Sequence, residues 1–174
     1  MKKKKLVVFY GVREIGKTTF LMKVVPQLIQ QDYHVSGVLS PAVFTNGEKT
    51  GINVQDVSTG EERILAIRRN DENLQDETPG YEFNESNLLW GNEILRDAVP
   101  TDVLIVDELG PLEIKFQKGW QFGVKAVESG DYDLCIVVLR EELHTFIRGD
   151  WPITDWVAYH PDLEPNYFNH YLST

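Results

Sequence analysis

One segment near the start of the chain constrains its fold more than any other feature. Residues 11–18 read Gly-Val-Arg-Glu-Ile-Gly-Lys-Thr and fit the pattern G-x-x-x-x-G-K-[ST]. A short apolar run at 6–10 precedes the segment, and apolar residues recur every three or four positions from 17 to 31 after it. These flanks predict a buried parallel strand and an amphipathic helix. The order strand, glycine-bordered loop and helix is typical of a phosphate-binding loop.

The residue types in this loop suit an anion accompanied by a metal ion. Gly11 and Gly16 permit a backbone path that turns successive N–H groups toward anionic oxygens, and the helix dipole adds to their field. Lys17 can neutralise the β- and γ-phosphates, Thr18 can coordinate Mg²⁺, and Thr19 can donate to the α-phosphate. We therefore expect a nucleoside triphosphate as ligand and Mg²⁺ as cofactor. The expected nucleotide-binding residues are Gly11, Val12, Arg13, Glu14, Ile15, Gly16, Lys17, Thr18 and Thr19.

Glu14 is the unusual member of this loop. A carboxylate beside bound phosphates reduces affinity through charge repulsion unless its side chain points outward. Arg13 and the neighbours of Lys17 are candidate partners for an outward-pointing Glu14. The sequence alone leaves the orientation of this side chain open.

A second acidic element follows another apolar run. Residues 103–108 read Val-Leu-Ile-Val-Asp-Glu, which predicts a strand that ends in two carboxylates at the carboxyl edge of the sheet, near the phosphate loop. In this Walker-B-like arrangement, Asp107 can hold a magnesium-bound water and Glu108 can orient and deprotonate the attacking water. Acids at strand ends also occur in ordinary solvated loops, but the phosphate loop in the same chain favours the catalytic interpretation.

The rest of the chain alternates between strand and helix patterns. Strands are expected at 35–39, 103–106, 134–139 and 156–159, and helices near 84–99, 118–129 and 141–148, with Asn84 or Ser86 as a cap. Pro26 predicts a kink or an early end in the first helix. Short segments at 43–45, 51–57 and 62–67, separated by turn signals, predict an antiparallel insertion, and the polar stretch 70–80 predicts a mobile surface loop. The pattern favours an α/β fold whose parallel sheet is covered by helices on both faces.

Length and charge limit the class of protein. The 174 residues suit a single domain, 1–174, and the formal net charge of −10 argues against nucleic-acid binding by charge alone. No apolar stretch approaches the length that spans a bilayer, so we expect no membrane partner and a cytoplasmic location. Cys135 lies in an apolar run and is expected to be a buried residue without a redox role.

The two motifs together resemble one family. Residues 11–19, taken with Val-Asp-Glu-Leu-Gly-Pro-Leu-Glu at 106–113, resemble the thermostable nucleoside-triphosphatase family, often called THEP-type. The resemblance extends to about residue 139 and implies a three-layer, RecA-like P-loop fold. It also implies Mg²⁺-dependent hydrolysis of ATP, GTP and related triphosphates to the diphosphate and phosphate. It assigns the metal role to Asp107, the base role to Glu108, and an acidic-loop position to Glu113. The chain departs from the family pattern at 13–15 and at 40–42.

Two weaker candidates lie toward the C-terminus. Arg140 follows the strand expected at 134–139, where a positive charge can offset charge that develops on the γ-phosphate. Alternatively, it pairs with Glu141 or Glu142. The expected catalytic residues are therefore Glu108, Lys17 and Arg140, and the expected metal ligands are Thr18 and Asp107. Aromatic residues are frequent after position 150 and favour core packing over stacking on a base or a partner surface.

Two other functions would use the same loop. A small-molecule or nucleotide kinase would replace water with a hydroxyl or monophosphate acceptor, and a nucleotide-dependent switch would hydrolyse slowly and depend on a partner. Glu108 beside Asp107 favours water, because it supplies a base. A hydrolase is therefore the leading hypothesis, and the sequence identifies no protein partner.

Overall fold

The apolar runs form the inner strands of a mixed sheet. The computed structural model describes residues 3–69, 80–147, 149 and 151–173, and within them the sheet has nine strands in the order β6-β5-β4-β2-β7-β8-β1-β9, with β3 paired to β4. The strands are β1 (Lys5–Gly11), β2 (Val35–Leu39), β3 (Ala42–Thr45), β4 (Glu48–Asp56), β5 (Glu62–Arg68), β6 (Tyr81–Phe83), β7 (Thr101–Leu109), β8 (Tyr132–Arg140) and β9 (Ile153–Ala158). The helices are α1 (Lys17–Gln30), α2 (Glu85–Asp97), α3 (Pro111–Ile114), α4 (Gln121–Ser129), and the 3₁₀ segments η1 (Glu141–Phe146) and η2 (Tyr167–Tyr171).

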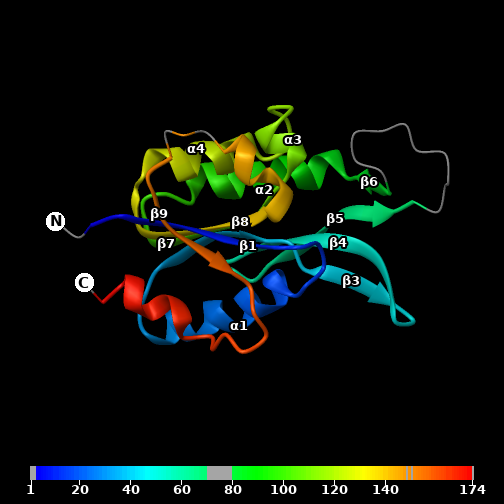
Figure 1. Ribbon diagram of the computed structural model, residues 1–174. Helices are drawn as coiled ribbons and strands as arrows, with labels where there is room; N and C mark the ends of the chain where they lie inside the picture. The colour runs from blue at the N-terminus through cyan, green and yellow to red at the C-terminus, as the bar shows by residue number, and fades with distance from the viewer. Residues whose placement is uncertain (1–2, 70–79, 148, 150, 174) are drawn as a thin grey trace.

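The parallel part of the sheet consists of β2, β7, β8, β1 and β9. Its centre is fully buried over 103–106 and 134–139, as expected of strands covered on both faces. Figure 1 shows α1 and the C-terminal segment on one face of the sheet, and α2, α3 and α4 on the other. The expected three-layer α/β arrangement is therefore confirmed.

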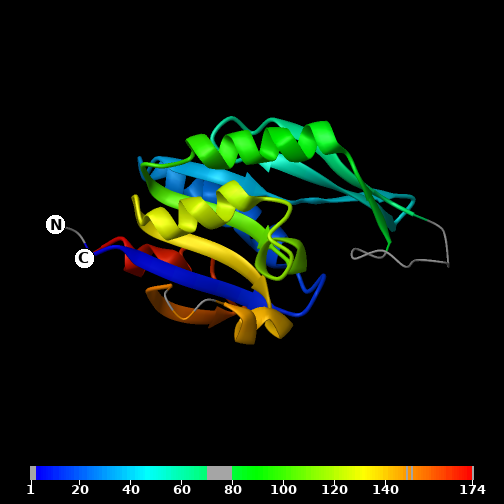
Figure 2. The same ribbon diagram turned by 90° about the horizontal axis from the view of Figure 1, so that it is seen from above.

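The antiparallel insertion extends the sheet beyond β2. Strands β3, β4, β5 and β6 pair antiparallel, and β4 joins β2 through the pair Val38 and Asp56. Figure 2 shows these strands reaching past the helical layers. The insertion is confirmed, and it is larger than the sequence indicated because the short strand β6 had no recognisable pattern. The stretch 70–79 lies outside the described residues, so its expected mobility stays a prediction.

The helices follow the sequence signals with a few differences. Asn84 caps α2, since its side chain accepts a hydrogen bond from the N–H of Asn87 at 3.0 Å. α1 continues through Pro26 to Gln30, so the expected early end is wrong. The last turn of α1 keeps its apolar face against the sheet, and this packing outweighs the one backbone donor that proline removes. Within the described residues, no helix has both the length and the apolar composition that crossing a bilayer requires.

The C-terminal aromatic residues complete the core beneath α1. Phe168 is fully buried, with ring centroids 5.6 Å from Phe9 and 6.3 Å from Phe20. The Tyr171 hydroxyl donates to Asp155 Oδ2 at 2.6 Å, which ties η2 to β9. Core packing is therefore confirmed for Phe168 and Tyr171, and also for the buried Trp151.

Gly37 allows β2 to lie against β7, and we predict that it is the glycine whose replacement costs most. Its φ is +116°, and a Cβ added there would lie 1.9 Å from the carbonyl oxygen of Ile105. Gly37→Ala is therefore expected to lower the free energy of unfolding by about 3 kcal/mol or more, because left-handed backbone strain adds to a backbone clash.

Gly60→Ala is the matched control, because Gly60 has a φ of +76° and no described residue lies within 4 Å of an added Cβ. It should lose only about 1–2 kcal/mol from backbone strain. Urea unfolding of both variants checks the difference, and equal losses would contradict the proposed clash.

Candidate active site

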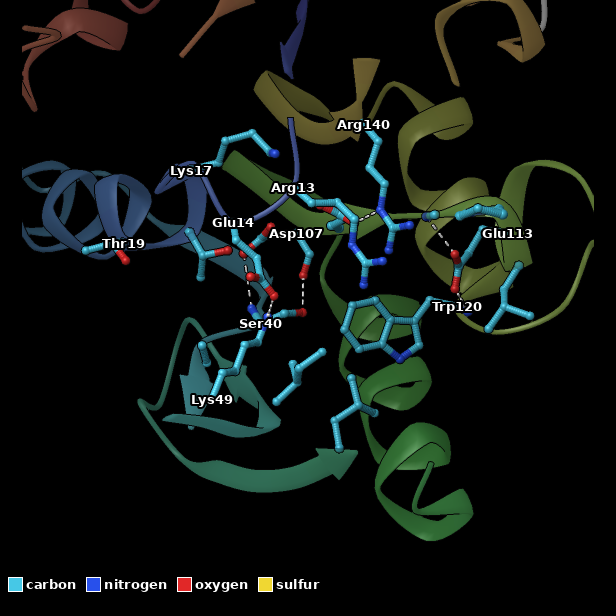
Figure 3. Close-up of a pocket in the computed structure, with 18 of the residues that line it drawn as sticks. Arg13, Glu14, Lys17, Thr19, Ser40, Lys49, Asp107, Glu113, Trp120 and Arg140 are labelled. Atoms are coloured by element: carbon cyan, nitrogen blue, oxygen red, sulfur yellow. Dashed lines mark hydrogen bonds and ion pairs between the residues drawn. The ribbon is translucent and has the colours of Figure 1, made fainter. Parts of the chain in front are cut away.

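The carboxyl ends of three parallel strands meet at one edge of the sheet. In the strand register Gly11 lies beside Arg140, and Leu109 lies beside Leu139. The phosphate loop after β1, the acidic end of β7 and the arginine at the end of β8 therefore face the same cavity, of about 470 Å³ (Figure 3). This is the edge at which ligands bind in open α/β sheets.

The phosphate loop is held in its path by backbone geometry and packing. Glu14 and Gly16 both have positive φ, and a Cβ at Gly16 would lie 3.1 Å from the Tyr159 hydroxyl. The Lys17 ammonium is buried and donates to the carbonyl oxygens of Gly11 at 2.9 Å and Val12 at 2.8 Å. Burial lowers the pKa of Lys17, and the carboxylates of Glu108 and Asp107 act in the opposite direction.

Glu14 points outward from the phosphate loop. Its Oε1 accepts a hydrogen bond from Lys49 Nζ at 2.9 Å, and its side chain is 60% exposed. The hydrogen bond and charge of Lys49 lower the pKa of Glu14, so the carboxylate is ionised and neutralised locally. The partner is thus a residue of β4 in the antiparallel insertion, 35 positions away, and neither of the two partners that the sequence suggested.

The end of β7 departs from regular strand pairing, and both of its acids line the cavity. The register with β8 shifts between Val106 and Leu109, so Asp107 and Glu108 fall outside the regular pairing. Successive residues of a regular strand point to opposite faces, whereas an irregular strand end can present neighbouring side chains on one side. Both carboxylates line the same cavity, Asp107 fully buried and Glu108 about three-quarters buried.

The two carboxylate oxygens of Asp107 differ in their hydrogen bonding. Oδ2 accepts from the Ser40 N–H at 3.1 Å, while the buried Oδ1 has no hydrogen-bond partner among the described residues. The Ser40 hydroxyl also donates to the main-chain oxygen of Asp107 at 2.5 Å. Burial, followed by the charge of Glu108, raises the pKa of Asp107 to about 6, and the hydroxyl of Thr18 opposes this shift.

These oxygen atoms form a donor set that fits Mg²⁺. Magnesium prefers one or two carboxylates, and it completes its shell with waters and substrate phosphates. The unpaired Oδ1 of Asp107 and the hydroxyl of Thr18 are hard donors beside the phosphate loop. A divalent cation there would also remove the cost of burying the Asp107 charge.

Arg140 and Glu108 form an ion pair across the edge of the sheet. Arg140 Nε donates to Glu108 Oε1 at 2.6 Å, and both side chains are about three-quarters buried. The alternative that the sequence suggested, an ion pair of Arg140 with Glu141 or Glu142, is therefore not the contact that the structure shows. The strand order explains the arrangement, since β8 lies between the phosphate-loop strand β1 and the acidic strand β7.

Glu113 fixes the loop that follows the acidic strand. Its carboxylate accepts from the Gly110 N–H at 2.8 Å and from the Trp120 N–H at 3.0 Å. Burial raises the pKa of Glu113, and these backbone donors partly offset that effect. The side chain therefore joins the end of β7 to Trp120, whose indole also lines the cavity (Figure 3).

Sequence analysis missed several residues of the cavity. Ser40 appeared only as part of a departure from the family pattern, although the parallel register of β2 with β7 could have placed it beside Asp107. Lys49 and Trp120 carried no local signal, because each reaches the site through tertiary pairing. The other missed residues are apolar: Phe44, Ile52, Leu65, Phe83 and Leu88.

Comparisons with known proteins agree with this geometry. A family model described as NTPase matches residues 7–150. The nucleoside-triphosphatase THEP1 of Methanosarcina barkeri is 26% identical over 141 residues, which cover 79% of this chain and 78% of the relative. That of Methanopyrus kandleri is 36% identical over 111 residues, which cover 63% of this chain and 59% of the relative.

Two solved structures share the fold. The solution structure of a human cancer-related nucleoside triphosphatase aligns with a TM-score of 0.66 at 20% identity, over 97% of this chain and 93% of the other. The crystal structure of THEP1 from Aquifex aeolicus aligns with a TM-score of 0.58 at 16% identity, over 90% of each chain. The family model covers most of the chain and includes both the phosphate loop and the acidic strand. The chain therefore belongs to the THEP1-type NTPase family of P-loop proteins.

Proposed function

We propose that residues 1–174 act as a single P-loop domain that hydrolyses nucleoside triphosphates to the diphosphate and phosphate with Mg²⁺. The observation that carries the proposal is the buried Asp107, which lies near Lys17 and Glu108 and whose Oδ1 lacks a hydrogen-bond partner in the described part of the chain. An unpaired buried carboxylate is costly, and a phosphate-bound cation is the ligand that would satisfy it. The named activity of the relatives, nucleoside-triphosphatase, supports the same reaction.

The phosphate loop binds the triphosphate, and Lys17 changes its hydrogen-bond partners when it does so. Its ammonium donates to two loop carbonyls, and these hydrogen bonds can be replaced by bonds to the β- and γ-phosphates. Thr18 and Asp107 are the residues that would hold Mg²⁺. When bound, the ion would neutralise charge on the bridging and terminal phosphate oxygens. Glu14 stays outside the phosphate cup because Lys49 holds it there.

Glu108 is the proposed general base, and Arg140 stabilises developing charge. Glu108 accepts a proton from water as the water oxygen attacks the γ-phosphorus and the bond to the β-phosphate oxygen breaks. Arg140 lies between the first residue of the phosphate loop and Glu108, so its guanidinium can turn from the carboxylate toward the γ-phosphate. The diphosphate and inorganic phosphate are the products.

Replacing the base should reduce turnover with little effect on binding. Glu108→Gln keeps the shape of the side chain but removes its proton acceptor, so kcat is expected to fall about a hundredfold to a thousandfold. KM should change little, because Glu108 does not belong to the phosphate loop. Glu141→Gln is the control, since Glu141 is exposed at the start of η1, directly after Arg140. Phosphate release from ATP and GTP checks this, and unchanged turnover in Glu108→Gln would contradict the assigned base.

Asp107 should make the metal-free protein sensitive to pH. Because its folded-state pKa is about 6 against an ordinary 3.8, protonated Asp107 contributes stability below pH 3.8, and that contribution is lost as the pH rises through 6. The full difference corresponds to about 3 kcal/mol. Without metal or nucleotide, Asp107→Asn should therefore melt above the wild type at pH 7.5, and the gap should narrow toward pH 4.5.

The same variant tests the metal site. Mg²⁺ with a non-hydrolysable triphosphate is expected to raise the melting temperature of the wild type more than that of Asp107→Asn. Asp162→Asn serves as the control, because the Asp162 side chain is 90% exposed. Melting curves that coincide for wild type and Asp107→Asn at every pH would count against the buried, metal-binding carboxylate.

A further inference from the structure

The cavity has two chemically different halves. The phosphate loop, Asp107, Glu108 and Arg140 line a charged half, together with Lys49, which pairs with Glu14 of the loop. Apolar side chains of the insertion, of α2 and of the loop before α4 line the other half. The apolar half includes Phe44, Ile52, Leu65, Phe83, Leu88 and Trp120. A cavity of about 470 Å³ lies within the usual size range of small-molecule sites. A single attacking water needs about 30 Å³ and gains nothing from apolar walls.

The apolar half lies on the side of the cavity from which a nucleophile approaches. Glu113 ties the Trp120 backbone to Gly110, two residues after Glu108. In Figure 3, Trp120 and Thr19, the expected α-phosphate contact, lie on opposite sides of Asp107. Attacking and leaving oxygens are roughly in line in phosphoryl transfer, so the acceptor approaches from the side opposite the diphosphate. The apolar half is therefore placed for an acceptor and is poorly placed for the nucleobase.

The surfaces of this half favour a flat, uncharged ring. Its walls carry aromatic side chains from β3, β6 and the loop before α4, which stack or pack edge-on with rings. Phe44 is 64% exposed at the edge of the cavity, and a bound ring would cover it. Glu113 also lines the cavity, but both of its carboxylate oxygens accept from main-chain N–H groups. Glu108, which lines the charged half, would therefore be the proton acceptor for a hydroxyl on the ring compound.

We infer that the apolar half binds an uncharged, ring-bearing alcohol, which accepts the γ-phosphoryl group in place of water. The alcohol oxygen forms a bond to the γ-phosphorus, the bond to the β-phosphate oxygen breaks, and the hydroxyl proton passes to Glu108. The products are a phosphate monoester and the nucleoside diphosphate. The inference rests on the proposed nucleotide site, and hydrolysis is then the reaction in the absence of the alcohol.

The test uses four probes with the intact chain, Mg²⁺ and γ-labelled ATP: 2-naphthylmethanol, benzyl alcohol, thymidine and inosine. At least one probe should divert label from free phosphate into a phosphate ester while diphosphate formation continues. Leu88→Trp fills the apolar half and should lower the ratio of ester to phosphate at least about tenfold. Leu89→Trp is the matched control on the same helix, because Leu89 is 64% exposed and does not line the cavity, and it should leave the ratio unchanged.

Phe44→Ala is a second test of the apolar half that does not depend on correct folding of Leu88→Trp. Truncating the exposed Phe44 side chain costs little stability. It should weaken probe binding about tenfold, as measured by thermal shift with a non-hydrolysable triphosphate. Hydrolysis without formation of any ester and without probe binding would overturn the inference but leave the proposed function intact. An ester yield that is the same in Leu88→Trp and in the wild type would have the same consequence. Absence of phosphate release without probes, in contrast, would overturn the proposed hydrolysis itself.

Discussion

Burying a carboxylate without a full set of hydrogen-bond partners destabilises the folded state. The candidate site is arranged around such a carboxylate, that of Asp107. Asp107 lies near the carboxyl end of β7, with one oxygen bonded to the Ser40 N–H and the other unpaired within the residues that the structure describes. Besides Ser40, the hydroxyl of Thr18 and the ammonium of Lys17 also favour the ionised form of Asp107. The charge of Glu108 opposes them, so burial still dominates the pKa of Asp107. A group kept at such a cost is typical of a functional site, where stability is exchanged for ligand affinity.

The order of the strands places the other polar groups of the cavity around Asp107. Because β8 separates β1 from β7, the phosphate loop and the acidic strand end are one strand apart, and Arg140 occupies the position between them. A sheet in which β1 and β7 were neighbours would leave no strand end there. At the irregular end of β7, Asp107 and Glu108 both line this cavity. Topology and one local irregularity thus account for the relative placement of the main polar groups.

The sequence predicted the parts of this arrangement that depend on short segments. The phosphate loop, the buried strands at 103–106 and 134–139 and the cap at Asn84 all have local signals, since glycine spacing, apolar runs and capping residues act within a few positions. The contacts that escaped prediction join distant segments. Glu14 finds Lys49 only because the insertion folds back against the phosphate loop, and Trp120 reaches the cavity through Glu113. The early end expected at Pro26 failed for the same reason, because tertiary packing overrode a local preference.

In the proposed mechanism, the ion pair between Arg140 and Glu108 couples binding of the triphosphate to the availability of the base. A carboxylate that is bonded to a guanidinium offers fewer lone pairs to an incoming proton, so Glu108 acts as a base most readily after Arg140 has turned away. A bound γ-phosphate is a competing anion that can draw Arg140 toward the phosphate loop. The base is then released only when the phosphoryl donor is in place. Such an exchange limits the reaction to the occupied site, whether the acceptor next to Glu108 is water or a hydroxyl held against the apolar wall.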